Sequence, residues 1–293
     1  MADAFSYSPP LAPADRAALA KAVEALEKTS FTARMTALLG RQIGLVGALA
    51  PARVSSVVSR AAGAALKGAL HVALSSLRKT PAQNSSKQDS RNLHRTLAAA
   101  SGAAGGAFGL ASLPVELPVS TAIMLRSIAD IARAEGEDLG KPETALACLQ
   151  VFALGGYSAG ADVLDGGYFA VRGLLAKSIS EAAAYVAQKG VVDEAAPVLV
   201  RLMGQIAGRF GVVVSQKLAA QAVPLIGAVG GAAVNLAFTD HFQGLAHGHF
   251  TVRRLERRYG EEIVRAEYEK IAIESGFTPK ARGAAAGAAG RPA

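Results

Sequence analysis

Residues 52–79 read ARVSSVVSRAAGAALKGALHVALSSLRK, a run whose apolar positions repeat with a helical period. Cationic side chains recur along it at separations of 7, 7, 4 and 7 residues: Arg53, Arg60, Lys67, His71 and Arg78. At about 100° per residue these side chains fall within roughly 40° of one helical face. Small and apolar side chains hold the opposite face: Val58, Ala62, Ala65, Ala69 and Ala73, flanked by Leu66, Leu70 and Leu77. The stretch therefore predicts one amphipathic helix of about 40 Å, with a basic side and a side that packs on a neighbour.

The same period continues along most of the chain and predicts an all-α protein. The expected helices are 15–28, 31–49, 52–79, 93–112, 119–135, 142–155, 168–188, 194–208, 211–222, 226–247 and 250–275. Together they form a single domain of packed helices and small-residue hairpins over residues 15–275, with a polar loop at 80–95. Residues 1–14 and the Ala/Gly-rich residues 276–293 are expected to be flexible ends.

Composition excludes several classes of protein. The 293 residues include 63 Ala and 31 Gly, and the mean hydropathy is +0.28, too apolar for a disordered chain. The single cysteine, Cys148, excludes a disulfide scaffold and a cysteine-ligated metal site. The first 20 residues lack the basic-then-apolar order of a secretory signal, so we expect a cytoplasmic protein.

Positive charge is concentrated in the first third of the chain. The net charge is +8, but the segment Lys28–Arg95 alone carries eleven Lys/Arg and one acid, a net of +10. Such a segment is compatible with an ordinary solvated surface, with an anionic lipid surface, or with nucleic acid. Interleaved aromatics and nucleic-acid-binding motifs are missing, which disfavours nucleic acid. We expect Arg53, Arg60, Lys67 and Arg78 to bind an anionic membrane surface.

Two stretches without charge reach the length of a membrane span, Thr96–Val115 with 20 residues and Leu218–Thr239 with 22. Both consist largely of Ala and Gly, and both are interrupted by proline, which favours helix–turn–helix hairpins. The alternatives are buried core helices of a soluble bundle, shallow insertion into a membrane, and full spanning. Glu116 and Asn235 lie at or within these stretches and would be costly in hydrocarbon unless they are paired.

One motif resembles a catalytic one. Gly156-Tyr157-Ser158-Ala159-Gly160 fits the G-x-S-x-G pattern of serine hydrolases. That pattern requires a strand before the serine, whereas residues 143–154 have a helical period. We therefore expect no catalytic residue here, and a hydrolase that uses Ser158 stays as an alternative.

The densest group of possible metal ligands is His241, His247 and His249. These three do not share a face of a straight helix, although Gly244 and Gly248 could bend the chain and bring them together. We expect no metal and no cofactor, and a metalloprotein is part of the same alternative. In the next segment Arg253, Arg254, Arg257 and Arg258 alternate with Glu256, Glu261 and Glu262, as expected for a solvated helix surface.

Three blocks of the sequence resemble the EcsC family of bacterial proteins. They are LPVELPVSTAIMLRSIADIARAEGEDLGKPETALACLQVFALGG (113–156), RFGVVVSQKLAAQAVPLIGAVGGAAVNLAF (209–238) and HFQGLAHGHFTVRRLERRYG (241–260). The resemblance extends over about residues 95–272. The resemblance implies an all-helical, membrane-associated bacterial protein. The protein that gave the family its name is encoded beside the components of an ABC transporter. The resemblance implies no catalytic residues.

These observations predict a non-enzymatic helical protein, cytoplasmic and peripheral to the inner membrane. It would act as an accessory to a membrane or transport process. Its expected partner is anionic lipid or a membrane protein complex. We do not expect it to bind nucleic acid. A soluble scaffold that pairs with another helical protein, or with a second copy of itself, through its Gly/Ala faces is a further alternative.

Overall fold

The computed structural model describes residues 11–27, 52–76, 113–155, 167–189, 196–221 and 227–277. Within these residues the chain forms helices and no strand, which confirms the expected all-α class. The helices are α1 (Pro13–Glu27), α4 (Ala52–Ser76), α6 (Leu113–Ala134), α7 (Pro142–Leu154), α8 (Tyr168–Lys189), α9 (Pro197–Gln221), α10 (Gly227–Tyr259) and α11 (Glu261–Glu274). The expected polar loop at 80–95, and most of both expected flexible ends, lie outside the described residues.

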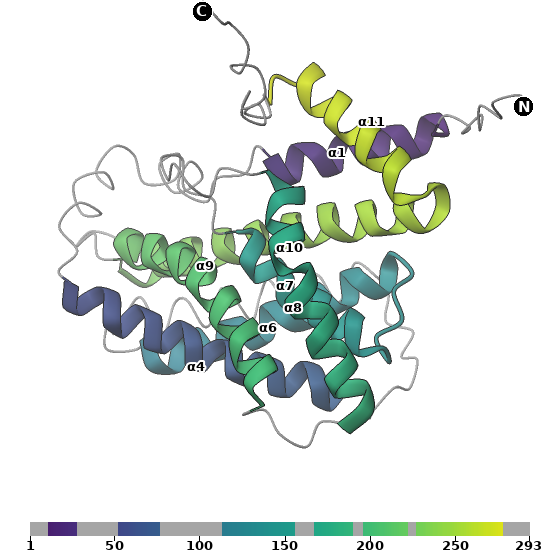
Figure 1. Ribbon diagram of the computed structural model, residues 1–293. Helices are drawn as coiled ribbons and strands as arrows, with labels where there is room; N and C mark the ends of the chain where they lie inside the picture. The colour runs from purple at the N-terminus through teal and green to yellow at the C-terminus, as the bar shows by residue number, and fades with distance from the viewer. Residues whose placement is uncertain are drawn as a thin grey trace, which may run out of the picture.

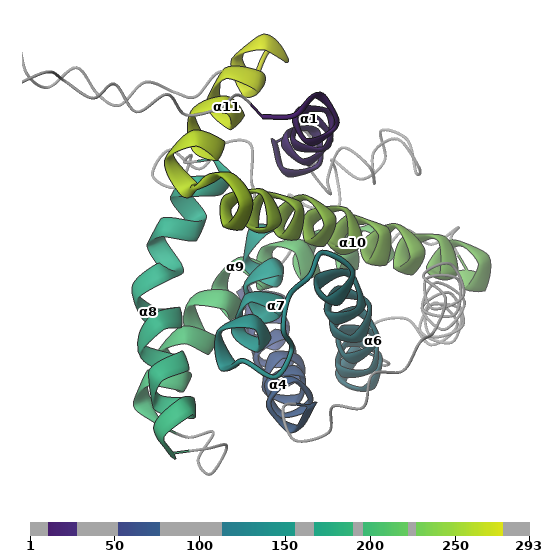
Figure 2. The ribbon, with the colours of Figure 1, turned by 90° about the vertical axis from the view of Figure 1, so that its right-hand side faces the viewer.

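Helix α10 has 33 residues, is about 50 Å long and divides the molecule into two parts (Figures 1 and 2). Helices α1 and α11 pack on one side of α10 and on each other. Helices α6, α7 and α9 contact α10 from the other side, and α4 lies beyond them, in contact with all three. Helix α8 packs along α7 and α9. As a result, α4 and α11 lie at opposite ends of the molecule.

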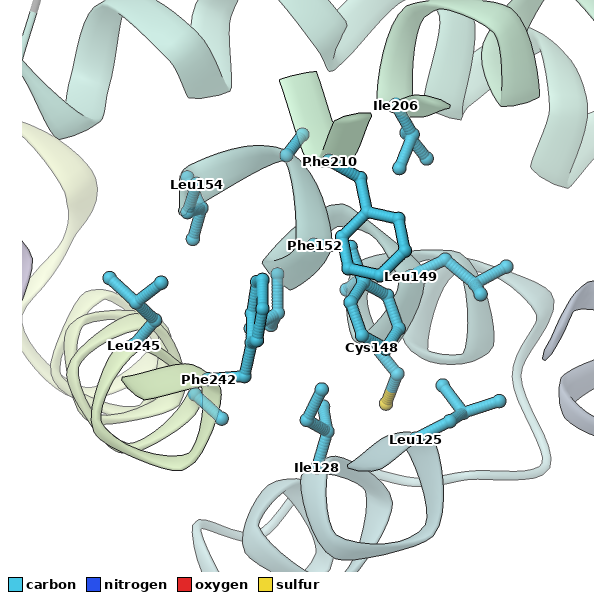
Figure 3. Close-up of a cluster of buried hydrophobic side chains, with 14 of the residues drawn as sticks. Leu125, Ile128, Cys148, Leu149, Phe152, Leu154, Ile206, Phe210, Phe242 and Leu245 are labelled. Carbon is cyan, nitrogen blue, oxygen red and sulfur yellow. The ribbon is translucent and has the colours of Figure 1, made fainter. Parts of the chain in front are cut away.

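Helix α7 is the centre of the core, because it contacts α4, α6, α8, α9 and α10. Every residue from Thr144 to Leu154 is buried, as a helix without a polar face requires. The Phe152 ring centroid lies 5.1 Å from that of Phe210 and 5.3 Å from that of Phe242. Figure 3 shows this cluster with its neighbours from α6, α7, α9 and α10: Leu125, Ile128, Cys148, Leu149, Leu154, Ile206 and Leu245.

Several helix boundaries differ from the sequence prediction. The expected helices 194–208 and 211–222 form one helix, α9, and α10 continues to Tyr259 instead of ending at 247. Glycine inside a helix costs only about 1 kcal/mol relative to alanine, and burial of the neighbouring apolar side chains outweighs that cost. Helix α6 begins at Leu113 and includes Pro118, which was expected to precede a helix. Pro118 is the sixth residue of α6, so the helix continues through it at the loss of one backbone hydrogen bond, the one to the carbonyl of Pro114.

The chain turns sharply after α6 at Gly136, whose φ of 82° is left-handed. The amide of Glu137 donates to the carbonyl of Ala132 at 3.0 Å, which closes the end of the helix. This turn places the Glu137 side chain beside the last third of α10, where it meets two arginines described below.

Helix α1 approaches α10 very closely at Gly248. A Cβ at this position would lie 2.7 Å from Cγ of Leu26 and 3.2 Å from the carbonyl oxygen of Ala22. Only glycine permits this approach, which buries Leu19, Ala22, Val23 and Leu26 of α1. Gly248 thus serves helix packing, and α10 continues through both Gly244 and Gly248.

Candidate functional site

The basic side of α4 is oriented as the sequence predicts, as far as its side chains are described. Arg60, Lys67 and His71 are exposed; we call these three the basic face. The opposite side of the helix is buried: Val58, Ala62, Ala65, Leu66, Ala69, Leu70 and Ala73. The Arg53 side chain and Arg78 lie outside what the structure describes. The basic face points away from α6, α7 and α9, because the buried side of α4 packs against those helices.

The two polar residues of the uncharged stretches, Glu116 of α6 and Asn235 of α10, meet at one buried lysine. Nζ of Lys217, from α9, donates to Oε1 of Glu116 at 2.7 Å and to Oδ1 of Asn235 at 2.8 Å. The Lys217 residue is 0% exposed, and its Nζ lies 4.7 Å from the Phe238 ring centroid. We call Lys217, Glu116 and Asn235 the buried lysine site.

Burial and ion pairing shift the pKa of Lys217 in opposite directions. Burial lowers the pKa of Lys217 below its ordinary value, while the charge of Glu116 and its hydrogen bond raise it. The net shift is downward. A buried ion pair of this kind contributes little net stability, but removal of one partner leaves an uncompensated charge in the core. The buried lysine site therefore links α6, α9 and α10 through groups that depend on one another.

Sequence reasoning recognised Glu116 and Asn235 as polar groups in need of partners and missed the partner itself. Lys217 directly precedes the second uncharged stretch, and the sequence analysis did not single it out. The available signal was the cost of leaving a carboxylate and an amide unpaired in an apolar stretch. That cost predicts a cation nearby, but only the packing of α6 against α9 and α10 identifies which one.

The three histidines do not converge. His241 is buried near the end of α7, where a Cβ on Gly155 would lie 3.1 Å from its Nε2. Nδ1 of His249 faces the hydroxyl of Tyr168 at 2.9 Å, while His247 is only half-buried. No group of three His, Cys, Asp or Glu side chains within the described ranges is placed to hold a metal ion. Ser158 lies outside those ranges.

The Tyr168–His249 pair is fully enclosed. Burial raises the pKa of Tyr168 to about 12, and Nη1 of Arg172 donates to the same hydroxyl at 3.3 Å. Burial, and then the positive charges of Arg172 and Arg253, hold the pKa of His249 well below its ordinary value. Both groups are therefore neutral at physiological pH, and the positive potential around them comes from arginines of α8 and α10.

Arg257 and Arg258 of α10 are exposed, as the predicted solvated surface requires, but Arg253 and Arg254 are half-buried, and all four pair with acids of other segments. Nε and Nη2 of Arg253 donate to both carboxylate oxygens of Glu137, at 2.8 and 3.1 Å, and Arg257 donates to Glu137 as well. Arg254 pairs with Glu135 and Asp15, and Arg258 pairs with Asp15. Their partners come from α1 and from the turn after α6. These contacts between distant segments could not be derived from spacing within one helix.

One helix among the described residues is long and apolar enough to cross a membrane by length and composition, Pro197–Ala220 in α9. Only 39% of its most apolar window is buried inside the molecule. Val200 and Val212 on this helix are exposed. Core helices of soluble proteins also reach this length and composition, so the feature alone decides nothing about a membrane.

Comparison with known proteins gives one match. A model of the EcsC protein family matches residues 16–255, which is most of the chain and includes the first two blocks quoted above and most of the third. No curated protein and no solved structure matches the chain.

Proposed function

The chain belongs to the EcsC protein family, and from this premise we propose that it docks on an anionic membrane surface through the basic face of α4. In this proposal it has no enzymatic role, lies on the cytoplasmic side of the inner membrane, and serves a membrane or transport process such as that of an ABC transporter. The exposure of Arg60 and Lys67 on one side of a helix is the observation that carries the proposal.

Electrostatics supports this orientation. A basic residue near an anionic lipid surface contributes about 1 kcal/mol, so Arg60 and Lys67 together correspond to roughly 30-fold in affinity. His71 lies on the same face. The sequence adds Arg53 and Arg78 at the same helical spacing. The segment Lys28–Arg95, which contains α4, has a net charge of +10, more than the +8 of the whole chain.

Sedimentation with vesicles tests the proposal. The purified full chain is mixed with phosphatidylglycerol–phosphatidylcholine vesicles or with pure phosphatidylcholine vesicles at low and at high salt. We expect binding to the anionic vesicles only, and weaker binding at high salt because salt screens exposed charges. The double variant Arg60→Glu/Lys67→Glu should bind at least about tenfold more weakly.

A matched control separates the basic face from net charge. Lys21 of α1 and Lys270 of α11 are exposed at the other end of the molecule. The variant Lys21→Glu/Lys270→Glu changes the net charge by the same amount and should bind nearly as well as the wild type. Equal losses in the two double variants, or equal binding to neutral vesicles, would contradict docking through α4.

A further inference from the structure

A cavity of about 230 Å³ opens where the first turns of α8 meet the end of α10 and the start of α11. Every residue that lines it is charged: Arg172, Arg253, Glu256, Arg257 and Glu261. We call it the arginine cavity. It has no part in the proposed membrane docking, because α4 lies at the opposite end of the molecule from α11.

Two carboxylates pair with these guanidinium groups, Glu256 within the lining and Glu137 outside it. Arg172 makes a two-pronged contact with Glu256, with N···O distances of 2.6 and 2.8 Å. The carboxylate of Glu137 accepts hydrogen bonds from both Arg253 and Arg257, and the Glu137 side chain is only 5% exposed. These contacts fix the position of each planar group, so the arginines reach the cavity already ordered.

The same contacts leave donors unused. Both terminal nitrogens of Arg172 and of Arg257 donate hydrogen bonds, and so do Nε and Nη2 of Arg253. Within the described residues, Nε of Arg172, Nη1 of Arg253 and Nε of Arg257 make no hydrogen bond. Each of these nitrogens carries hydrogen and can only donate, which favours an acceptor-rich partner.

The cavity lining carries three arginines against two carboxylates, Glu256 and Glu261, a net charge of +1. Two of the three arginines also oppose protonation of the nearby His249, so positive potential extends behind the cavity. Glu137 and Glu256 are both engaged with arginine. Glu261, at the start of α11, is the exposed acid of the lining and would repel an anion.

The geometry points to a binding site for a small soluble oxyanion of the phosphate class in the arginine cavity. Three guanidinium groups on two helices suit a tetrahedral anion, whose oxygens can each face a different arginine. A single carboxylate has only two oxygens for three arginines. The volume admits a phosphate or a small phosphomonoester. The site faces away from a membrane that contacts α4, so the ligand comes from solution.

Isothermal titration calorimetry with inorganic phosphate and with glycerol 3-phosphate tests the site, with sodium chloride at equal ionic strength as the reference. Arg257 and Arg258 form a matched pair, because they are adjacent, both are paired with acids, and only Arg257 lines the cavity. We expect Arg257→Gln to weaken binding at least about tenfold, while Arg258→Gln stays close to the wild type. Glu261→Gln should bind several-fold more tightly, because a repelling charge is removed. Thermal unfolding without ligand verifies that each variant is folded.

Absence of binding to either anion, equal losses in the two arginine variants, or no gain in Glu261→Gln would overturn the assignment. Vesicle sedimentation distinguishes a soluble anion from a lipid headgroup. Arg257→Gln should bind phosphatidylglycerol vesicles like the wild type, whereas loss of vesicle binding would overturn a solution ligand. Failure of the α4 variants to affect vesicle binding would contradict the proposed docking and leave the phosphate result unchanged.

Discussion

Lys217 of α9 and Glu116 of α6 are 101 positions apart in the sequence, and Nζ of the lysine lies 2.7 Å from Oε1 of the glutamate. Both residues are buried, and Asn235 of α10 accepts a second hydrogen bond from the same lysine. The junction of three helices thus depends on a polar contact enclosed by apolar side chains. Such a contact makes the core sensitive to the loss of one partner and tolerant of the loss of both.

Single and double substitutions at this pair should therefore differ sharply. Lys217→Met or Glu116→Leu alone should lower the free energy of unfolding by about 3–5 kcal/mol, because one buried charge is left uncompensated in the core. The double variant Lys217→Met/Glu116→Leu should lose much less than the sum of the two single losses, because no charge is left uncompensated and only the hydrogen bond from Lys217 to Asn235 is missing. Urea denaturation measures each variant. Additive losses in the double variant would show that the two side chains are not coupled.

Two glycines of α10 should respond oppositely to alanine. Gly248→Ala should destabilise the protein by about 1–3 kcal/mol, because the new Cβ would lie 2.7 Å from Leu26 and force α1 away from α10. Nothing lies within 4 Å of a Cβ at Gly244, so Gly244→Ala should stabilise the helix by up to about 1 kcal/mol. Thermal unfolding of the two variants measures the difference. Equal effects of the two substitutions would contradict the close packing of α1.

Acid should weaken the attachment of α1 to α10. The hydrogen bond from Tyr259 and contacts with Arg254 and Arg258 hold the pKa of Asp15 below its ordinary value. Since the folded state then binds fewer protons than the unfolded state, the stabilisation is present above pH about 4 and is lost as the pH falls through the lowered value. Asp15→Asn should remove it, lowering stability by about 1–3 kcal/mol at neutral pH.

The measurement is urea denaturation of wild type and Asp15→Asn as a function of pH. The difference between the two should be constant near neutral pH and should shrink below pH about 4. Glu262→Gln, at an exposed carboxyl on α11, is the control and should show no such difference. A gap between wild type and Asp15→Asn that grows in acid would contradict the role of the Asp15 contacts.

Cys148 should be inert toward thiol reagents in the folded protein. It is buried at the centre of α7, and burial raises the pKa of its thiol to about 12. Both the shortage of thiolate and the lack of access slow the reaction. Labelling with Ellman's reagent should be slow at neutral pH and become fast in denaturant. Rapid labelling of the native protein would show that the helices around α7 open readily.

Periodicity predicted the fold class and most of the helices, since an amphipathic or fully apolar pattern is a local property. The sides of α4 illustrate this, because Ala62 and Leu66 are buried and Arg60 and Lys67 are exposed as their spacing predicts. Helix continuity was predicted less well. Packing decides whether a chain continues through glycine or proline, as α10 does at Gly248 and α6 does at Pro118.

The candidate sites also differ in whether local sequence or tertiary packing determines them. The basic face is contained in one helix, and the sequence by itself predicted it, together with the all-α class and the need of Glu116 and Asn235 for polar partners. Only the tertiary structure decided that Lys217 satisfies both of these residues, and that Arg253 and Arg257 meet Glu137 from the turn after α6. The physical reason is that spacing along a helix fixes which side a residue occupies, whereas a polar contact between helices depends on how they pack. That packing is the sum of many apolar contacts, and no short segment encodes it.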